Sequence, residues 1–207
     1  MKTFRALAAL LMYPEAELIE ALPELRAELP RDRDLSALID ELASEELHVL
    51  QERYVDLFDR SRALSLHLFE HVHGESRDRG QAMVDLAQTY SSRGMVVAGN
   101  ELPDYVPAFL EFLSLLSREE AQGLIGETAD ILRPIGDRLA ERGSRYAAVF
   151  GAVLAVGGEA GLTRPLAKRR TPLEENSPAA IDKVWMEEPV TFGGPQPVKF
   201  YPKGARP

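Results

Sequence analysis

Three of the four histidines of this 207-residue chain lie in the short segment 67–73. On a helix, His67 and His71 would share one face because they are four residues apart, and Glu70 would lie between them. This H-x-x-E-H pattern is typical of inverted zinc peptidases, in which two imidazoles bind the metal and the carboxylate acts as the base. A zinc-dependent hydrolase is therefore one hypothesis, but it needs a third ligand that nothing in the sequence singles out. The alternative is a half-exposed helix whose histidines contact local carboxylates.

Other catalytic chemistry finds little support in the composition. The chain has no cysteine, which excludes disulfides, thiol nucleophiles, thiolate zinc sites and cysteine-bound iron–sulfur clusters. Its glycine pairs, Gly157–Gly158 and Gly193–Gly194, lack the strand–loop–helix setting of a phosphate-binding loop. We therefore expect no catalytic residue, no bound cofactor and no metal site, and predict that the protein is not an enzyme.

The elements that position these residues are predicted to be helices throughout. Apolar residues recur with helical period up to about residue 158, and alternating strand patterns are absent. The predicted helices cover residues 4–11, 18–25, 35–42, 47–58, 77–90, 105–116, 118–142 and 144–156. The sequence thus predicts an all-α, single-domain helical bundle over residues 1–160.

Two helix starts are predicted from capping residues. Ser76 follows a glycine and is a suitable N-cap for a helix over 77–90. Pro103 and Pro107 limit where the next helix can begin, because proline is tolerated only in the first turn. With Asp104 as the N-cap, Pro107 would occupy the third helical position.

The last part of the chain has a different composition. Eight of the fourteen prolines follow residue 160, and few apolar residues accompany them. Such a segment buries too little surface to offset its ordering entropy, so 161–207 is predicted to be a flexible, largely disordered tail. Residues 181–188 are an exception because they are apolar in part and contain the only tryptophan, Trp185. We expect this segment to form a short helix that docks on the body or on a partner.

The charge is distributed unevenly between these two parts. The net charge of the chain is −9, and residues 161–207 contribute eight Lys/Arg against five Asp/Glu, which leaves about −12 on residues 1–160. Nucleic-acid binding requires Lys and Arg to neutralise phosphates, so no nucleic-acid partner is expected. An acidic body favours basic partners such as cationic peptides, although solubility alone would explain the charge equally well.

No segment resembles a signal peptide or a membrane span. The apolar start is followed by Pro14, Glu15 and Glu17, where a cleavage site would need small residues. The longest apolar stretch elsewhere, 146–156, is shorter than the ~20 residues that a membrane helix requires. We expect a soluble, cytoplasmic protein that does not insert into membranes.

Four segments carry a resemblance to a known family. Residues 69–86, FEHVHGESRDRGQAMVDL, resemble the signature of the NarJ family, the delta-type nitrate reductase molybdenum-cofactor assembly chaperones. Residues 54–60 resemble the Y-x-x-L-F segment of the wider TorD/DmsD chaperone family, and 181–192 resemble the tryptophan-containing NarJ tail. Residues 101–105 resemble the E-x-P-D-H motif, but Tyr105 replaces the histidine, which puts in doubt any role that needs an imidazole proton.

The resemblance implies an all-α chaperone that binds the N-terminal segment of the apo nitrate reductase catalytic (alpha) subunit. It implies that the chaperone prevents premature membrane docking and promotes insertion of the bis-molybdopterin guanine dinucleotide cofactor and maturation of a nearby iron–sulfur cluster. Molybdenum-cofactor biosynthesis proteins would be further partners. A generic helical scaffold is a third hypothesis, which would show no preference for this client segment.

We expect the client segment to bind as an amphipathic helix in an apolar groove. Apolar side chains would form its walls, carboxylates would face basic client residues, and His71 and His73 would add pH sensitivity. About half of these residues are expected to be ordinary core or solvated rim instead. The predicted client-binding residues are Tyr54, Leu57, Phe58, Phe69, Glu70, His71, His73, Glu75, Arg77, Asp78, Met83, Glu101, Pro103, Asp104, Tyr105 and Phe109.

Overall fold

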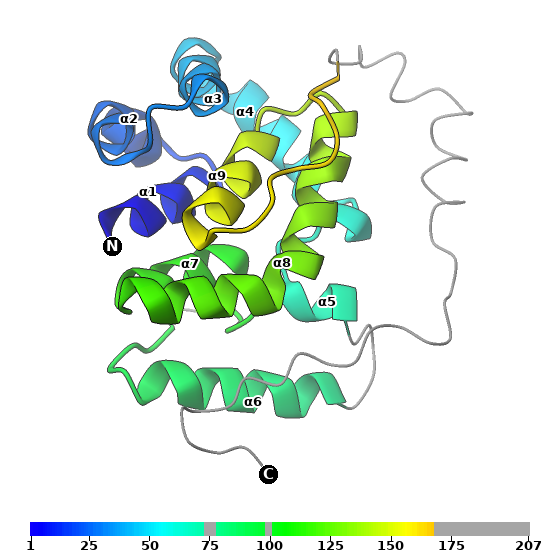
Figure 1. The fold of residues 1–207 in the computed structure, drawn as a ribbon. Helices are drawn as coiled ribbons and strands as arrows, with labels where there is room; N and C mark the ends of the chain where they lie inside the picture. Colours follow the sequence, from blue (N-terminus) through cyan, green and yellow to red (C-terminus); the bar gives the residue numbers. More distant parts are fainter. Residues whose placement is uncertain (73–77, 98–100, 168–207) are drawn as a thin grey trace.

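The computed structural model describes residues 1–72, 78–97 and 101–167, and these residues form a bundle of α-helices (Figure 1). In chain order the helices are α1 (Lys2–Leu10), α2 (Ala16–Glu28), α3 (Arg33–Ser44), α4 (Leu47–Tyr54), α5 (Leu68–Val72), α6 (Asp78–Ser91), α7 (Val106–Ser114), α8 (Arg118–Glu141) and α9 (Ala147–Gly157). The described residues contain no strand, only an isolated antiparallel bridge between His67 and Tyr105. The prediction of an all-α fold is confirmed.

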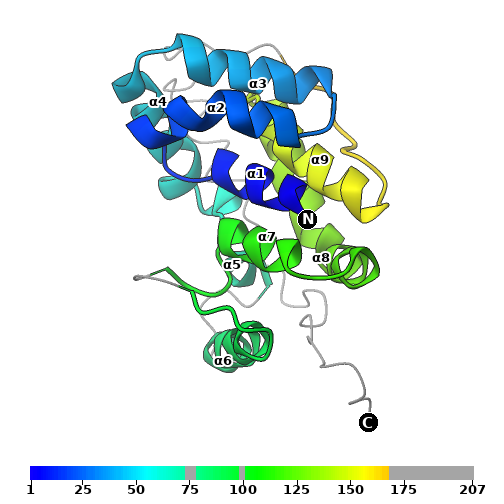
Figure 2. The same ribbon diagram turned by 90° about the vertical axis from the view of Figure 1, so that its left-hand side faces the viewer.

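The core lies where α1, α7, α8 and α9 meet. α8 packs along α9, and α1 packs against α7, α2 and α9. Fully buried side chains fill the space between these helices, among them Phe4 of α1, Phe109 of α7, Leu132 of α8 and Phe150 of α9. α6 lies apart from this arrangement, below α5, α7 and α8 in both views (Figures 1 and 2).

The long helix α8 begins and its partner α9 ends with standard capping chemistry. The Ser117 hydroxyl accepts from the Glu120 amide while the Glu120 carboxylate accepts from the Ser117 amide, which completes a capping box. α9 ends at Gly157, and its C-cap Gly158 has a φ of 81°, the left-handed conformation that glycine adopts without steric cost. Capping residues in the sequence therefore fix where α8 begins and where α9 ends.

The predicted start of α7 is wrong. Its N-cap is Tyr105 rather than Asp104, and Pro107 is the second helical residue rather than the third. The Asp104 carboxylate is fully buried and accepts the backbone N–H of Phe69, in another helix, at 3.0 Å. A tertiary hydrogen bond thus takes the side chain that local chemistry would have used as a cap.

The fourth predicted helix, 47–58, is two elements. α4 ends at Tyr54, and Val55–Asp59 form a π-helical turn in which the Arg60 N–H donates to the Val55 carbonyl at 3.0 Å. Such turns are rare and occur frequently at functional sites. The turn lies within the Y-x-x-L-F segment.

The polypeptide after α9 runs back along α8. The Ala167 N–H donates to the Ala140 carbonyl at 2.8 Å, and the Thr163 amide donates to the Asp137 carboxylate at 2.7 Å. Residues 161–167, the first part of the predicted tail, therefore lie against the bundle. The predicted N-cap Ser76 and the predicted docking helix 181–188 fall outside the described residues. Within the described ranges no helix is long and apolar enough to cross a membrane.

Close packing of α8 on α9 yields a stability prediction. A Cβ built on Gly157 would lie 2.9 Å from Cβ of Ile125 and closer still to its Cγ2. We expect Gly157→Ala to lower the free energy of unfolding by about 1–3 kcal/mol, because overpacking forces the helices apart. Urea unfolding followed by circular dichroism measures the change.

Gly123→Ala is the matched control, since it changes the same residue type in α8 but its Cβ meets nothing within 4 Å. Alanine is the better helix former by about 1 kcal/mol, so this variant should be as stable as the parent or more so. Equal effects of the two substitutions would contradict the packing argument.

Candidate functional site

The segment before α5 and the turn 101–105 lie side by side. The Val106 N–H donates to the Leu66 carbonyl at 2.8 Å, and the Leu68 N–H donates to the Asp104 carbonyl at 3.0 Å. These two hydrogen bonds flank the bridge between His67 and Tyr105. The backbone just before the family segment 69–86 is thereby joined to the turn 101–105, far away in the sequence.

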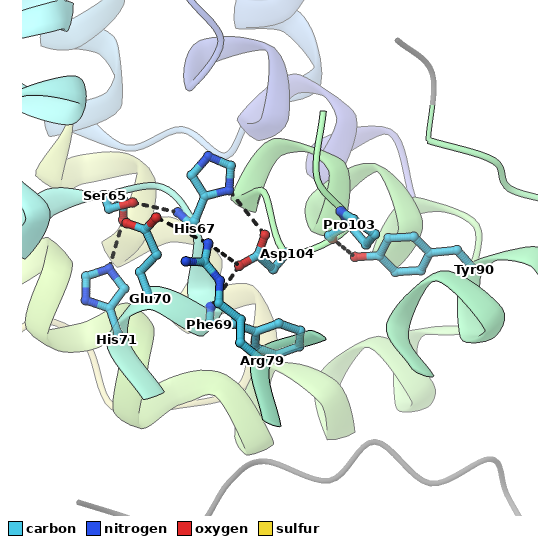
Figure 3. A network of polar contacts seen from close by, with 9 residues as sticks. All are labelled: Ser65, His67, Phe69, Glu70, His71, Arg79, Tyr90, Pro103 and Asp104. Atoms are coloured by element: carbon cyan, nitrogen blue, oxygen red, sulfur yellow. Dashed lines mark hydrogen bonds and ion pairs between the residues drawn. The ribbon is translucent and has the colours of Figure 1, made fainter. Parts of the chain in front are cut away.

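A buried carboxylate fastens this junction from inside (Figure 3). Besides the Phe69 amide, the Asp104 carboxylate contacts His67 Nδ1 at 3.2 Å and the Arg79 guanidinium at 4.0 Å. Its side chain has no solvent exposure, so it faces protein groups in this conformation. Asp104 therefore links the turn, the start of α5 and helix α6.

Helix α6 is held by polar contacts at its two ends and by apolar contacts between them. Arg79 forms an ion pair with Glu70 at 3.2 Å near one end, and Arg93, just beyond the other, pairs with Glu120 at 2.7 Å. The Tyr90 hydroxyl donates to the Pro103 carbonyl at 2.8 Å. Only Leu86 and Tyr90 of this helix are fully buried. The Tyr90 ring also packs on Phe112 with centroids 4.6 Å apart, so polar and apolar contacts together attach α6 to the bundle.

The geometry does not support the zinc hypothesis. His67 precedes α5 instead of lying within it, so His67 and His71 are not a pair on one helical face. His67 contacts Asp104, whereas His71 Nε2 donates to the Ser65 carbonyl at 2.8 Å. Among the described residues no three His, Cys, Asp or Glu side chains converge as metal ligands do.

The pKa values of His67 and His71 shift in opposite directions. The hydrogen bond to Asp104 raises the pKa of His67 above its ordinary value, although burial opposes this. Burial lowers the pKa of His71. Burial also raises the pKa of Glu70, but the Ser65 hydroxyl and Arg79 more than offset it, so this pKa lies below the ordinary value. His67 and Glu70 thus favour their charged forms beside Arg79 and Asp104.

Aromatic side chains connect this junction to α4 and the α1–α2 connection. The Tyr54 hydroxyl donates to the Leu11 carbonyl at 2.8 Å. The Tyr105 hydroxyl lies 3.1 Å from that of Tyr54 and must donate to it, since the Tyr54 hydrogen is already used. The ring of Tyr13 packs edge-on against Tyr54, with centroids 5.5 Å apart. Tyr105, which replaces the motif histidine, is therefore a hydrogen-bond donor in this position.

We call the exposed surface around these rings the Tyr105 surface; it comprises Tyr13, Asp59, Glu101, Leu102 and Tyr105. Tyr13 and Leu102 are 42% and 43% exposed, which is high for side chains of this size. Burial raises the pKa of Tyr105, and the carboxylates of Glu101 and Asp59 add to this. Among the described residues no Lys, Arg or His lies within ion-pair distance of either carboxylate. The surface combines apolar rings with unneutralised negative charge.

Three members of this surface, Tyr13, Asp59 and Leu102, are absent from the residues predicted from sequence. Asp59 directly follows Phe58 of the Y-x-x-L-F pattern, and Leu102 lies within 101–105, so their places beside or within a motif were the available signal. Tyr13 had no such signal, because only the ring contact across the bundle brings it to Tyr54.

The predicted groove walls lie deeper than expected. Leu57, Phe58, Phe69 and Phe109 are buried in the core, and Met83 of α6 is partly buried against it. Asp78 and Glu101 are exposed, and Pro103 is partly buried. The predicted residues His73, Glu75 and Arg77 fall outside the described residues. Direct client contact with the core residues stays a prediction that requires neighbouring helices to separate.

Comparison with known proteins places these motifs in a family. The model of the nitrate reductase delta subunit family matches residues 15–152. The chain belongs to this family. It is 40% identical over 193 residues to NarJ of Escherichia coli K12, a nitrate reductase molybdenum cofactor assembly chaperone, covering 88% of this chain and 81% of that protein. It is also 38% identical to NarW of the same organism, which is named a probable chaperone of the same kind, covering 93% and 84% of the two chains.

A solved structure supports the fold. A crystal structure from Archaeoglobus fulgidus, of a protein named for redox enzyme maturation, superimposes with a TM-score of 0.56 and covers 72% of this chain and 88% of that chain. At 21% identity the likeness concerns the fold alone. Because the family relatives are chaperones and not catalysts, the prediction that this protein is not an enzyme is confirmed.

The first prediction for the site concerns stability. Asp104→Ala removes the acceptor of the Phe69 amide and leaves His67 and Arg79 without this carboxylate. We expect a loss of about 1–3 kcal/mol in the free energy of unfolding, the usual effect of deleting one partner of a buried hydrogen bond. Glu101→Ala, three residues earlier but exposed, should change it by less than about 0.5 kcal/mol. Comparable losses in the two variants would contradict the buried role of Asp104.

The second prediction for the site concerns protonation. In a titration followed by histidine NMR signals, His67 should protonate at higher pH than His71, and Asp104→Asn should lower the pKa of His67 by removing its charged partner. Because folding raises this pKa, the pair stabilises the fold fully below the unfolded value of about 6.5 and loses that stabilisation as the pH rises through the folded value. An unchanged His67 pKa in Asp104→Asn would show that the contact is not formed in solution.

Proposed function

We propose that this protein is a cytoplasmic chaperone that binds the N-terminal segment of the apo nitrate reductase catalytic (alpha) subunit. In this proposal it promotes insertion of the molybdenum cofactor and maturation of the enzyme before membrane attachment. Family membership supports the chaperone role, since the relative from Escherichia coli is named for assembly of this enzyme. The observation that carries the client-binding part is the Tyr105 surface, where the exposed side chains of Tyr13 and Leu102 and the partly buried Tyr105 ring adjoin two carboxylates that form no ion pair with any described residue.

The chemistry of this surface suits a basic amphipathic helix. Tyr13, Leu102 and Tyr105 would contact its apolar face, as in helix-in-groove recognition. Asp59 and Glu101 would face its cationic side chains, and the acidic charge of residues 1–160 would speed the encounter. Tyrosine suits such a surface because it offers a large contact area and a hydroxyl at low entropic cost.

The attachment of α6 offers a way to enlarge the surface. The predicted client-binding residues Met83 and Phe69 lie on facing elements, α6 and α5, which Arg79 joins through Glu70 and Asp104. A basic client side chain that competes for Glu70 would weaken this joint. The client would then reach apolar side chains that are covered in the unbound conformation. Asp104 acts here as a positioning residue.

The proposal is tested by calorimetric titration of the full chain with a peptide that copies the client's N-terminal segment. We expect binding in wild type and a roughly two- to fivefold higher Kd for Glu101→Gln, because an exposed charge pair contributes about 0.2–1 kcal/mol. The difference should shrink at high salt, since exposed charges are screened.

The matched control is Glu24→Gln, which removes an exposed carboxylate from α2 and should leave the Kd unchanged at every salt concentration. No heat of binding with the wild-type protein up to millimolar peptide would remove the proposal. Equal effects of the two substitutions would place the client elsewhere than on the Tyr105 surface.

A further inference from the structure

Helix α9 has no polar side chain. Residues Ala147–Gly157 read AAVFGAVLAVG, although the helix lies at the outside of the bundle on one side (Figure 2). A helix that is apolar all round is normally buried on every side. α9 packs on α8, α1 and α3, which leaves a narrower face with Ala148, Gly151, Ala152 and Val156 partly buried and Ala155 exposed.

The segment that follows α9 covers part of this face. Leu162 lies against Gly151 and Gly136, and the segment is fastened to α8 by Thr163 and Ala167 (Figure 1). Arg133 adds hydrogen bonds to the carbonyls of Ala160 and Gly161, at 2.8 and 3.2 Å. The first residues after α9 are thus held as a strap that serves as an apolar cover.

Beside the strap, a groove of about 570 Å³ remains open between α9, the start of α3 and the strap itself. Its apolar lining includes Pro30, Ala148, Ala152, Ala155, Val156 and Leu166. Its volume is typical of pockets that bury a ligand of several apolar groups, about 300–1,000 Å³. No lining residue belongs to α5, α6 or the turn 101–105, so this groove is separate from the Tyr105 surface.

We propose that this groove is the docking site of the chain's own C-terminal segment, with Ile181, Val184 and Trp185 as the inserted side chains. The three residues follow at i, i+3 and i+4, which gives a short helix one apolar face. They are the apolar part of a stretch otherwise rich in proline and charge. The strap begins the cover of α9, and residues 181–186 complete it.

The position of the strap favours an occupant from the same chain. Leu166 lines the groove, so the chain leaves the described region at the groove's edge. The 13 residues 168–180 can span up to about 45 Å, far more than is needed to return to α9. A tether of this length holds the segment at an effective concentration on the order of millimolar, so weak apolar contacts suffice for docking.

The charges of the groove and of its occupant are balanced. Asp32, Asp34, Arg145 and Arg164 line the groove, two of each sign. Residues 181–186 contain one Asp and one Lys. Apolar contact therefore selects this groove, while the net +3 of residues 161–207 against about −12 on residues 1–160 keeps the tail close to the acidic body.

The test uses the fact that Trp185 is the only tryptophan, so tryptophan emission of the full chain reports on this segment alone. In wild type we expect emission shifted to the blue of the urea-unfolded chain and protection from acrylamide quenching. Ala152→Arg places a charged side chain in the groove and should move both readings to those of the unfolded chain. Ile181→Asp should do the same from the tail, where it cannot disturb the folding of the bundle.

Matched controls are Ala27→Arg, at an exposed position of α2, and Gln196→Asp, farther along the tail; both should retain the wild-type emission. Far-UV circular dichroism checks that Ala152→Arg keeps its helices, and Ile181→Asp decides the question if it does not. Wild-type emission equal to that of the unfolded chain, or emission insensitive to both groove and tail variants, would overturn the proposal. Loss of the blue shift on dilution would also overturn it, because the occupant would then be a second copy.

Discussion

The candidate site depends on the contacts that the buried Asp104 carboxylate makes. A carboxylate without solvent exposure is stable only when donors or cations surround it. Here the Phe69 amide and His67 Nδ1 contact it at the start of α5, and the Arg79 guanidinium of α6 lies 4.0 Å away. These contacts fix the start of α5 and helix α6 relative to the turn 101–105. The same requirement explains why α7 begins one residue later than its local sequence suggests: the side chain suited to cap it is already used.

The bundle carries two kinds of surface. Around Tyr105, aromatic rings adjoin carboxylates that pair with no cation of the described part of the chain, which suits a basic amphipathic partner that binds and leaves. Along α9 the face is apolar without charge, which suits a permanent cover. The two surfaces lie on different elements, so client binding and cover of α9 are separable properties of one bundle. α6 is joined to α5 by the Arg79–Glu70 ion pair and contributes two fully buried side chains, Leu86 and Tyr90, so its apolar interface is small next to those of the core helices.

Much of the fold was predictable because helix periodicity is local. Phe4, Leu7 and Leu10 recur at helical spacing and are buried as that spacing predicts. The family segments could also be recognised from the sequence, and the comparisons confirm the family. The roles of individual site residues were less predictable, since Phe58, Phe69 and Phe109 are apolar whether they line a groove or fill the core. Burial depends on what packs against each residue, and no short segment encodes that.

By itself, the sequence determined the helical class, the lack of thiol chemistry, the charge difference between the two parts of the chain and membership of a chaperone family. Each of these follows from composition, from a short spacing or from a motif. Only the tertiary structure decided that His67 and His71 bind different partners, that Asp104 faces inward and that Tyr13 joins the Tyr105 surface. These outcomes depend on contacts between residues 6 to 41 positions apart, which helix packing creates and local spacing does not specify.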